Sequence, residues 1–168
     1  MADLVLKGKA IKLGDSISTD DIIPGRFAHL RSDLPQLSRH IFEDAVPDFA
    51  SRVTKGDFLV VGKNFGQGSS REHAPVVIKM SGIGALLAKS TARIFFRNAI
   101  NQGLPVLLCD TDRINDGDQL EVNLTRGVIT NLTSEAGLIS AKMPPLMFAI
   151  VREGGLIPYI KKHRDFKL

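Results

Sequence analysis

The residue types best suited to chemistry lie in one short stretch, residues 62–75, which reads GKNFGQGSSREHAP. Gly66 and Gly68 permit tight turns and a close approach of the backbone to a ligand. A helix that begins in this stretch would offer free N–H groups to an anion. The guanidinium of Arg71 matches a carboxylate with a planar fork of donors. The stretch therefore predicts a site for a small molecule that carries a carboxylate.

A purely structural interpretation of the same serines also fits. Ser69 followed by Glu72 satisfies the capping-box pattern, in which the two side chains cap the first backbone donors of a helix. Pro75 favours a later helix start, because a proline beyond the first turn removes a helical hydrogen bond. A later start would leave Ser69 and Ser70 in the loop, free for a ligand. Spacing alone does not choose between the two interpretations.

The elements around this stretch predict an α/β fold with a small central sheet flanked by helices. Apolar runs at residues 57–61, 83–88 and 104–109 are typical of buried parallel strands, and helical stretches follow the first two. Ser90 is expected to N-cap the second helix and Gly103 to end it. The glycine-rich stretch then follows the carboxyl end of a strand, where open α/β sheets bind ligands.

Hydrophobic periodicity and turn residues predict the remaining elements. They are a strand at 4–13, a partly helical segment at 34–49, an antiparallel hairpin of 119–123 with 128–132, and a last helix at 145–153. No repeat or long linker interrupts the 168 residues. A single domain over residues 1–168 is therefore expected.

Composition restricts the class of protein. The chain is 43% hydrophobic and 24% charged, which is typical of globular proteins, and no apolar run is long enough to cross a bilayer. The start of the chain lacks the features of a signal peptide, so the cytoplasm is the expected compartment and no membrane contact is predicted. The net charge is +4, but the basic residues are scattered. We interpret the cluster at 161–164 as a solvated tail and predict no nucleic-acid partner.

Residues 64–75 resemble the signature of the swivelling domain of the aconitase superfamily. The resemblance continues in chain order at residues 14–15 with 19–26, 92–105 and 154–159. It covers nearly the whole chain and implies a swivelling β/β/α domain. It also implies a hydro-lyase: the small subunit of a two-chain enzyme of leucine biosynthesis that isomerises 2-isopropylmalate and 3-isopropylmalate by dehydration and rehydration.

The resemblance implies roles for individual residues. Ser69 is implied to be the catalytic base, and its alkoxide would need stabilisation by donors such as loop and helix-terminus N–H groups. Ser70 and Arg71 are implied to bind a substrate carboxylate. The supporting positions are Gly66, Gly68 and His73.

A second carboxylate contact is expected at Arg26, in the loop that also carries Asp20 and Asp21. The segment after Arg26 is implied to set substrate specificity. It comprises Phe27, Ala28, His29, Leu30 and Arg31. Apolar residues there favour an isopropyl group, whereas an arginine leaves room for an extra carboxylate. Small subunits of a homoaconitase or a dimethylmalate dehydratase are therefore the alternatives within the superfamily.

Dehydration also needs a group that takes up hydroxide. In the superfamily this group is a [4Fe-4S] cluster that three cysteines hold, with one iron open as a Lewis acid. This chain has one cysteine, Cys109, and its four histidines lack metal-ligand spacing, so no metal is expected in it. A large, cluster-bearing partner subunit is therefore implied. The alternative from another class is a non-catalytic anion-binding module, which would need no partner.

Overall fold

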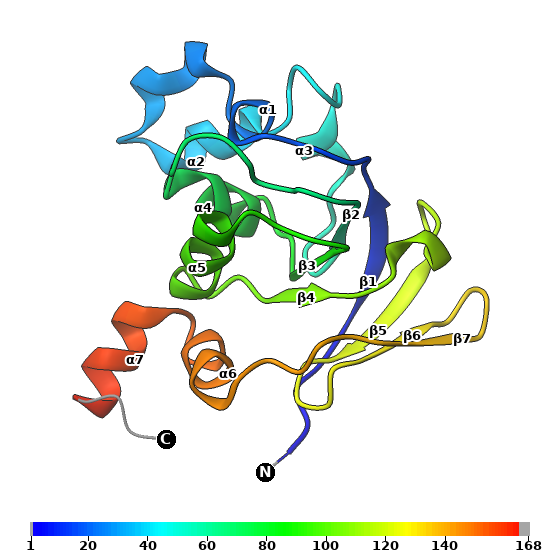
Figure 1. The fold of residues 1–168 in the computed structure, drawn as a ribbon. Helices are drawn as coiled ribbons and strands as arrows, with labels where there is room; N and C mark the ends of the chain where they lie inside the picture. The colour runs from blue at the N-terminus through cyan, green and yellow to red at the C-terminus, as the bar shows by residue number, and fades with distance from the viewer. Residues whose placement is uncertain (1, 165–168) are drawn as a thin grey trace.

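The computed structural model describes residues 2–164, in which seven strands form one mixed sheet of order β4-β3-β2-β1-β5-β6-β7 (Figure 1). The strands are β1 (Val5–Lys12), β2 (Phe58–Val61), β3 (Ala85–Ala88), β4 (Val106–Leu108), β5 (Gln119–Asn123), β6 (Val128–Asn131) and β7 (Ala136–Ile139). The α-helices are α1 (Thr19–Ile22), α2 (Leu34–Leu37), α3 (Phe49–Arg52), α4 (His73–Met80), α5 (Arg93–Asn101), α6 (Pro145–Arg152) and α7 (Leu156–His163). Three short 3-10 helices are η1 (Gly25–Leu30), η2 (Ser38–His40) and η3 (Thr111–Arg113).

Strand β1 joins a parallel half of the sheet to an antiparallel half. Residues 10–12 pair in parallel with β2, and residues 5–9 pair antiparallel with β5. The expected strand thus runs through Gly8 without a break. A Cβ atom on Gly8 would lie 2.3 Å from the carbonyl oxygen of Gly56. The absence of a side chain lets the turn before β2 cross close to β1.

Both faces of the parallel half are buried. Along β2, Leu59 and Val61 belong to one hydrophobic cluster, while Phe58 and Val60 belong to a second. The first cluster also includes buried residues of α4 and α5. The second is completed by apolar residues of the hairpin strands, including Leu120 of β5. This two-sided burial explains why the parallel strands have uninterrupted apolar sequences, and the expected hairpin of β5 and β6 is confirmed.

The segment at 34–49 was expected to be partly helical, and it forms less helix than that spacing indicates. Helix α2 spans four residues and is followed by η2 and turns. Phe42 and Asp48 have left-handed backbones, with φ values of 56° and 61°, which a continuous helix does not allow. The N–H of Phe42 instead donates to the carbonyl of Ile22 at 3.0 Å. A long-range contact therefore overrides the local helical preference.

The expected N-cap of α5 at Ser90 is wrong. The helix begins at Arg93 after Ala92 and has no side-chain cap. The hydroxyl of Ser90 accepts a hydrogen bond from the N–H of Asn64 at 2.9 Å, so it is engaged by another loop. The expected end of the helix is confirmed, because Gly103 follows the last residues with a φ of +73°.

Two elements of the carboxyl-terminal third are missing from the sequence prediction, namely strand β7 and helix α7. The cluster at 161–164 was interpreted as a solvated tail, but its first residues form the end of α7. Lys162 donates to Glu153 at 2.7 Å, and the ring of His163 stacks on Tyr159 with 4.5 Å between centroids. Among the described residues, none of the helices is long and apolar enough to span a membrane.

The close crossing at Gly8 predicts that Gly8→Ala destabilises the fold. The new Cβ would meet backbone atoms, which cannot move as cheaply as a side chain, so we expect a loss of about 1–3 kcal/mol in the free energy of unfolding by urea. Gly14→Ala is the matched control, since nothing lies within 4 Å of its added Cβ. That control is expected to change stability by less than about 1 kcal/mol. Equal stability of the two variants would contradict the close approach of Gly56 to Gly8.

Candidate functional site

The candidate site is built on the loop after β2, residues 62–72, which we call the site loop. One side of this loop is hydrogen-bonded to the chain that follows β1. The N–H of Gly66 donates to the carbonyl of Ile17 at 2.7 Å, and the N–H of Thr19 donates to the carbonyl of Gln67 at 2.8 Å. These bonds continue the parallel pairing of β1 and β2 beyond the regular strands, so the loop has a fixed position.

The other side of the site loop is bound to the chain that follows β3. The N–H of Phe65 donates to the carbonyl of Ser90 at 3.1 Å, and the N–H of Ala92 donates back to Phe65 at 2.8 Å. Gly66 lies against the ring of Phe95, since an added Cβ would be 2.3 Å from its Cγ atom, and its φ is +77°. Both the conformation and the contact require glycine there.

The capping interpretation of the serines is wrong. Helix α4 begins at His73, and its N-cap residue Glu72 makes no capping side-chain hydrogen bond. Pro75 lies in the first turn, where its missing N–H costs no helical hydrogen bond. Ser69 and Ser70 are therefore exposed loop residues, as a ligand-binding role requires.

Ser69 lies beside a buried hydroxyl that the sequence analysis did not single out. The Oγ1 atom of Thr19 is 3.3 Å from the Oγ atom of Ser69 and 3.2 Å from its carbonyl oxygen. Thr19 itself is 2% exposed. Because the two residues are 50 positions apart, only the pairing of the loops reveals this contact.

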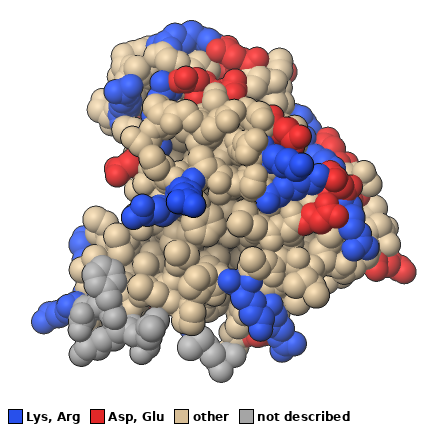
Figure 2. Space-filling model, viewed as in Figure 1, with Lys and Arg blue, Asp and Glu red and all other residues tan. Residues whose placement is uncertain are grey.

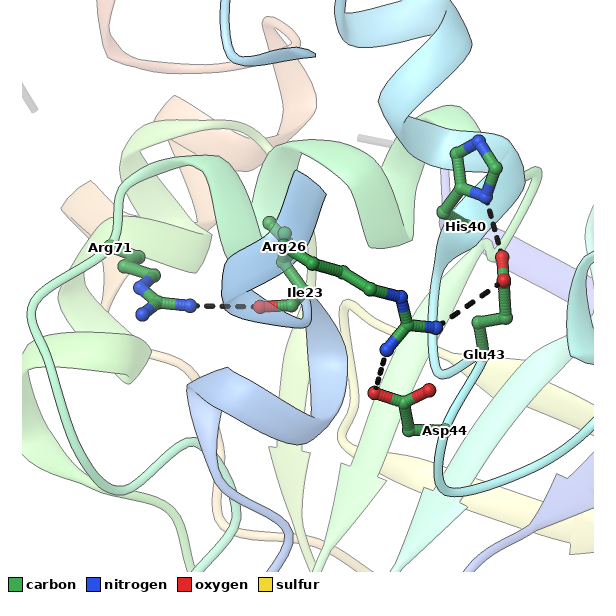
Figure 3. Close-up of polar contacts among 6 residues, drawn as sticks. All are labelled: Ile23, Arg26, His40, Glu43, Asp44 and Arg71. Carbon is green, nitrogen blue, oxygen red and sulfur yellow. Dashed lines mark hydrogen bonds and ion pairs between the residues drawn. The ribbon is translucent and has the colours of Figure 1, made fainter. Parts of the chain in front are cut away.

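Arg71 is anchored by the chain that follows β1. Its Nη1 atom donates to the carbonyl of Ile23 at 2.8 Å (Figure 3), and its Nη2 atom forms an ion pair with Asp20. The Arg71 side chain is 24% exposed. Asp21 has a different role, since it forms the reciprocal capping box of α1 with Ser18. The two neighbouring acids thus serve the site and the helix separately.

Part of the expected specificity segment reaches the signature residues. A small crevice is lined by Ala28 and Arg31 of that segment together with Arg71 and His73. The other members of the segment lie elsewhere. Phe27 stacks on His40 with 4.1 Å between ring centroids, Leu30 packs against the first hydrophobic cluster, and His29 contacts the carbonyl of Arg26.

Arg26 points away from Arg71 (Figure 3). Its guanidinium forms ion pairs with Asp44 and with Glu43, the latter at 3.4 Å, and it lies 4.6 Å from the centroid of the Phe27 ring. The hydrogen bond to Asp44 raises the pKa of Arg26, and the same bond lowers the pKa of the Asp44 carboxyl. The structure therefore does not bring this expected carboxylate contact to the other signature residues.

The described part of the chain does not fit a [4Fe-4S] cluster. Within residues 2–164, no group of three or more His, Cys, Asp or Glu side chains is arranged to hold a metal ion. Burial raises the pKa of the Cys109 thiol to about 12, with a smaller contribution from Asp110. A thiol that keeps its proton at neutral pH is a poor ligand for a metal.

Comparison with known proteins places the chain in a family. A sequence model of the aconitase C-terminal domain matches residues 15–110. The "3-isopropylmalate dehydratase small subunit 2" of Archaeoglobus fulgidus is 55% identical over 161 residues, which cover 96% of this chain and 98% of that protein. The chain belongs to the 3-isopropylmalate dehydratase small-subunit family. The "3-isopropylmalate dehydratase small subunit 1" of Thermotoga maritima, at 51% identity over 96% of this chain and 98% of its own, is a further relative.

A solved structure of a related protein confirms the predicted fold class. The crystal structure of 3-isopropylmalate dehydratase (leuD) from Methanocaldococcus jannaschii superposes with a TM-score of 0.92 at 41% identity and covers 96% of each chain. The α/β class and the central sheet flanked by helices are thus shared with that protein. The sheet is nevertheless larger than the small one expected, because the antiparallel strands continue it beyond β1.

Charged side chains on the face drawn in Figure 2 form several separate groups, and those on its right side mix both signs. Ion pairs of this kind include Lys89 with Asp112 and Arg52 with Asp116. The hydrogen bond between Lys89 and Asp112 raises the pKa of the lysine and lowers that of the acid. The scattered charge on this face agrees with the distribution expected from the sequence.

The raised pKa of Cys109 predicts slow thiol chemistry in the folded chain. At pH 8 the thiolate fraction is far smaller than that of an ordinary cysteine, so we expect Ellman's reagent to react at least about a hundredfold more slowly than with the chain unfolded in urea. The folded-state rate should rise as pH rises toward the raised pKa. Equal rates in the two states would contradict the burial of this thiol.

Proposed function

We propose that this chain is the small subunit of a hydro-lyase that isomerises 2-isopropylmalate and 3-isopropylmalate in leucine biosynthesis. The observation that carries the proposal is the fixed, exposed loop with Ser69, Ser70 and Arg71 in a chain 55% identical to a small subunit of that name. An exposed loop suits a site that two chains complete together. The membership in the family and the position of the loop at the carboxyl edge of the sheet support the same function.

Ser69 is the proposed base. Its Oγ atom takes the carbon-bound proton of the substrate as the neighbouring C–O bond breaks, and it returns the proton during rehydration. A serine hydroxyl ionises only with difficulty, so the alkoxide requires preorganised donors around it. The fixed backbone of the site loop offers such preorganisation, because it costs no rearrangement at the moment of reaction.

Arg71 and Ser70 are the proposed contacts of a substrate carboxylate. Arg71 uses two N–H groups for Ile23 and Asp20, and a guanidinium carries five in total. Donors therefore remain for a ligand while the side chain stays anchored. A charged, partly buried guanidinium binds a carboxylate more strongly than an exposed one.

Substrate choice is assigned to residues 27–31, of which Ala28 and Arg31 lie beside Arg71. The apolar residues of this segment suit an isopropyl group, and we therefore favour isopropylmalate. Arg31 could pair with an extra carboxylate, so homoaconitate and dimethylmalate are the substrates to test against it. Arg26 would become a second carboxylate contact only after it leaves Asp44 and Glu43.

The acceptor of the hydroxide is assigned to a partner chain. The described residues do not fit a cluster, so we propose that the large subunit carries the [4Fe-4S] cluster, whose open iron would take up the hydroxide. A single domain over residues 1–168, a cytoplasmic location and the absence of a nucleic-acid partner stay predictions.

The base assignment predicts that Ser69→Ala abolishes turnover without loss of assembly. We expect anaerobic turnover of 3-isopropylmalate by the chain reconstituted with its large subunit to fall at least about a thousandfold, as is typical when a catalytic nucleophile or base is removed. Association of the two subunits, measured by size-exclusion chromatography, should be unchanged. Unaltered turnover would refute Ser69 as base. Anion binding without a partner or turnover would support the binding-module alternative.

The carboxylate assignment predicts that Arg71→Lys raises KM. Lysine keeps the charge but cannot present a planar fork while it also contacts Ile23, so we expect KM for 3-isopropylmalate to rise about 10-fold to 100-fold. The matched control is Arg126→Lys on the β5–β6 turn, where the arginine pairs with Asp3 at 2.8 Å on the surface. That control should leave KM unchanged, and similar values for both variants would contradict the assignment.

A further inference from the structure

The contact between Thr19 and Ser69 has an unusual arrangement for two hydroxyl side chains. Thr19 is almost fully buried, at 2% exposure, whereas Ser69 is exposed. The Oγ1 atom of Thr19 lies within hydrogen-bond reach of both the carbonyl oxygen of Ser69, at 3.2 Å, and its Oγ atom, at 3.3 Å. One buried hydroxyl therefore faces two oxygen atoms of the proposed base.

The backbone gives the Thr19 hydroxyl little freedom. The N–H of Thr19 donates to the carbonyl of Gln67, and Thr19 begins helix α1 directly after its N-cap Ser18. Gly68 has a φ of +107°, and a Cβ on it would lie 3.1 Å from the Oγ1 atom of Thr19. The backbone of Gly68 thus lies close to the threonine hydroxyl. The bond to Gln67 and this close approach together keep the side chain of Thr19 beside that of Ser69.

A hydroxyl has one proton to donate and can also accept. While Ser69 is neutral, Thr19 can donate to the carbonyl of Ser69 and accept the proton of the Ser69 hydroxyl. Once Ser69 has lost its proton, its Oγ atom can only accept. The Thr19 proton then turns by rotation about the C–O bond from the carbonyl to the alkoxide. The change needs no movement of the backbone.

We propose that Thr19 is a positioning residue for Ser69, which aims the serine hydroxyl in the resting state and donates a hydrogen bond to its alkoxide in the reaction. This inference rests on the proposed role of Ser69 as base. The low exposure of Thr19 strengthens the effect, because a donor shielded from water stabilises a developing charge more than a solvated one. Thr19 acts through Ser69 and not on the substrate.

The test compares Thr19→Val with Thr19→Ser in the reconstituted two-subunit enzyme. Valine keeps the shape of threonine but removes the hydroxyl, while serine keeps the hydroxyl. We expect Thr19→Val to lower kcat for 3-isopropylmalate about 10-fold to 100-fold with little change in KM. Thr19→Ser should retain kcat within about threefold of wild type, since the donor remains.

The pH profile separates positioning from a merely structural role. Loss of a donor to the alkoxide raises the pKa of Ser69, so the ascending limb of the kcat profile in Thr19→Val should move to higher pH by about one unit or more. Thr19→Ser should keep the wild-type limb. A structural role of the hydroxyl would instead raise KM or lower the melting temperature in Thr19→Val and leave the limb in place. That result would overturn the inference.

The failure of this inference differs from the failure of the proposed function. If Ser69→Ala abolishes turnover but Thr19→Val has wild-type kcat and pH profile, Thr19 does not position the base, and the base assignment stands. If Ser69→Ala retains turnover, the base assignment is wrong, and the role of Thr19 is rejected with it. If Thr19→Val prevents subunit association, Thr19→Ala replaces it in the test. A loss of kcat in Thr19→Ala that Thr19→Ser does not share supports positioning, whereas equal losses of kcat in both variants reject it.

Discussion

Main-chain hydrogen bonds on both sides of residues 65–67 hold the site loop, and the other features of the site depend on them. The loop follows β2, which lies between β1 and β3 in the sheet, so the chain segments after both neighbours can pair with it. Those bonds fix Gly66 against Phe95 and place Thr19 beside Ser69. The signature serines are exposed, and they follow closely after these paired residues.

The parallel half of the fold could be predicted from local signals. Continuous apolar runs identify β2, β3 and β4, and the glycine after α5 marks its end, because these features depend on near neighbours in the chain. Pro75 correctly favoured a helix that starts after the serines. Local signals failed where a distant partner decides the outcome. Ser90 is a residue type that often caps helices, but its hydroxyl binds the backbone of Asn64. Phe42, in the segment expected to be helical, donates its N–H to the distant Ile22.

The site was predictable in part for the same reason. The signature identifies Ser69 and Arg71 from their own sequence context, and the structure anchors Arg71 on Ile23. The orientation of Arg26 could not be read from its context, since two acids 17 and 18 residues later hold it. Thr19 is adjacent to Ser69 only in space. A sequence motif shows which residues a site contains, whereas long-range pairing decides which of them meet.

The shared strand β1 has a consequence for how the chain is made. Its first half pairs with β5 of the hairpin, as at Val5 and Asn123, which are far apart in the chain. During synthesis the first strand leaves the ribosome long before that hairpin exists, and it must wait without its antiparallel partner. An unpaired strand edge offers free backbone donors and acceptors to a wrong partner. The parallel pairing of residues 10–12 with β2 can therefore form first, and the antiparallel pairing of residues 5–9 is completed only after β5 has been synthesised.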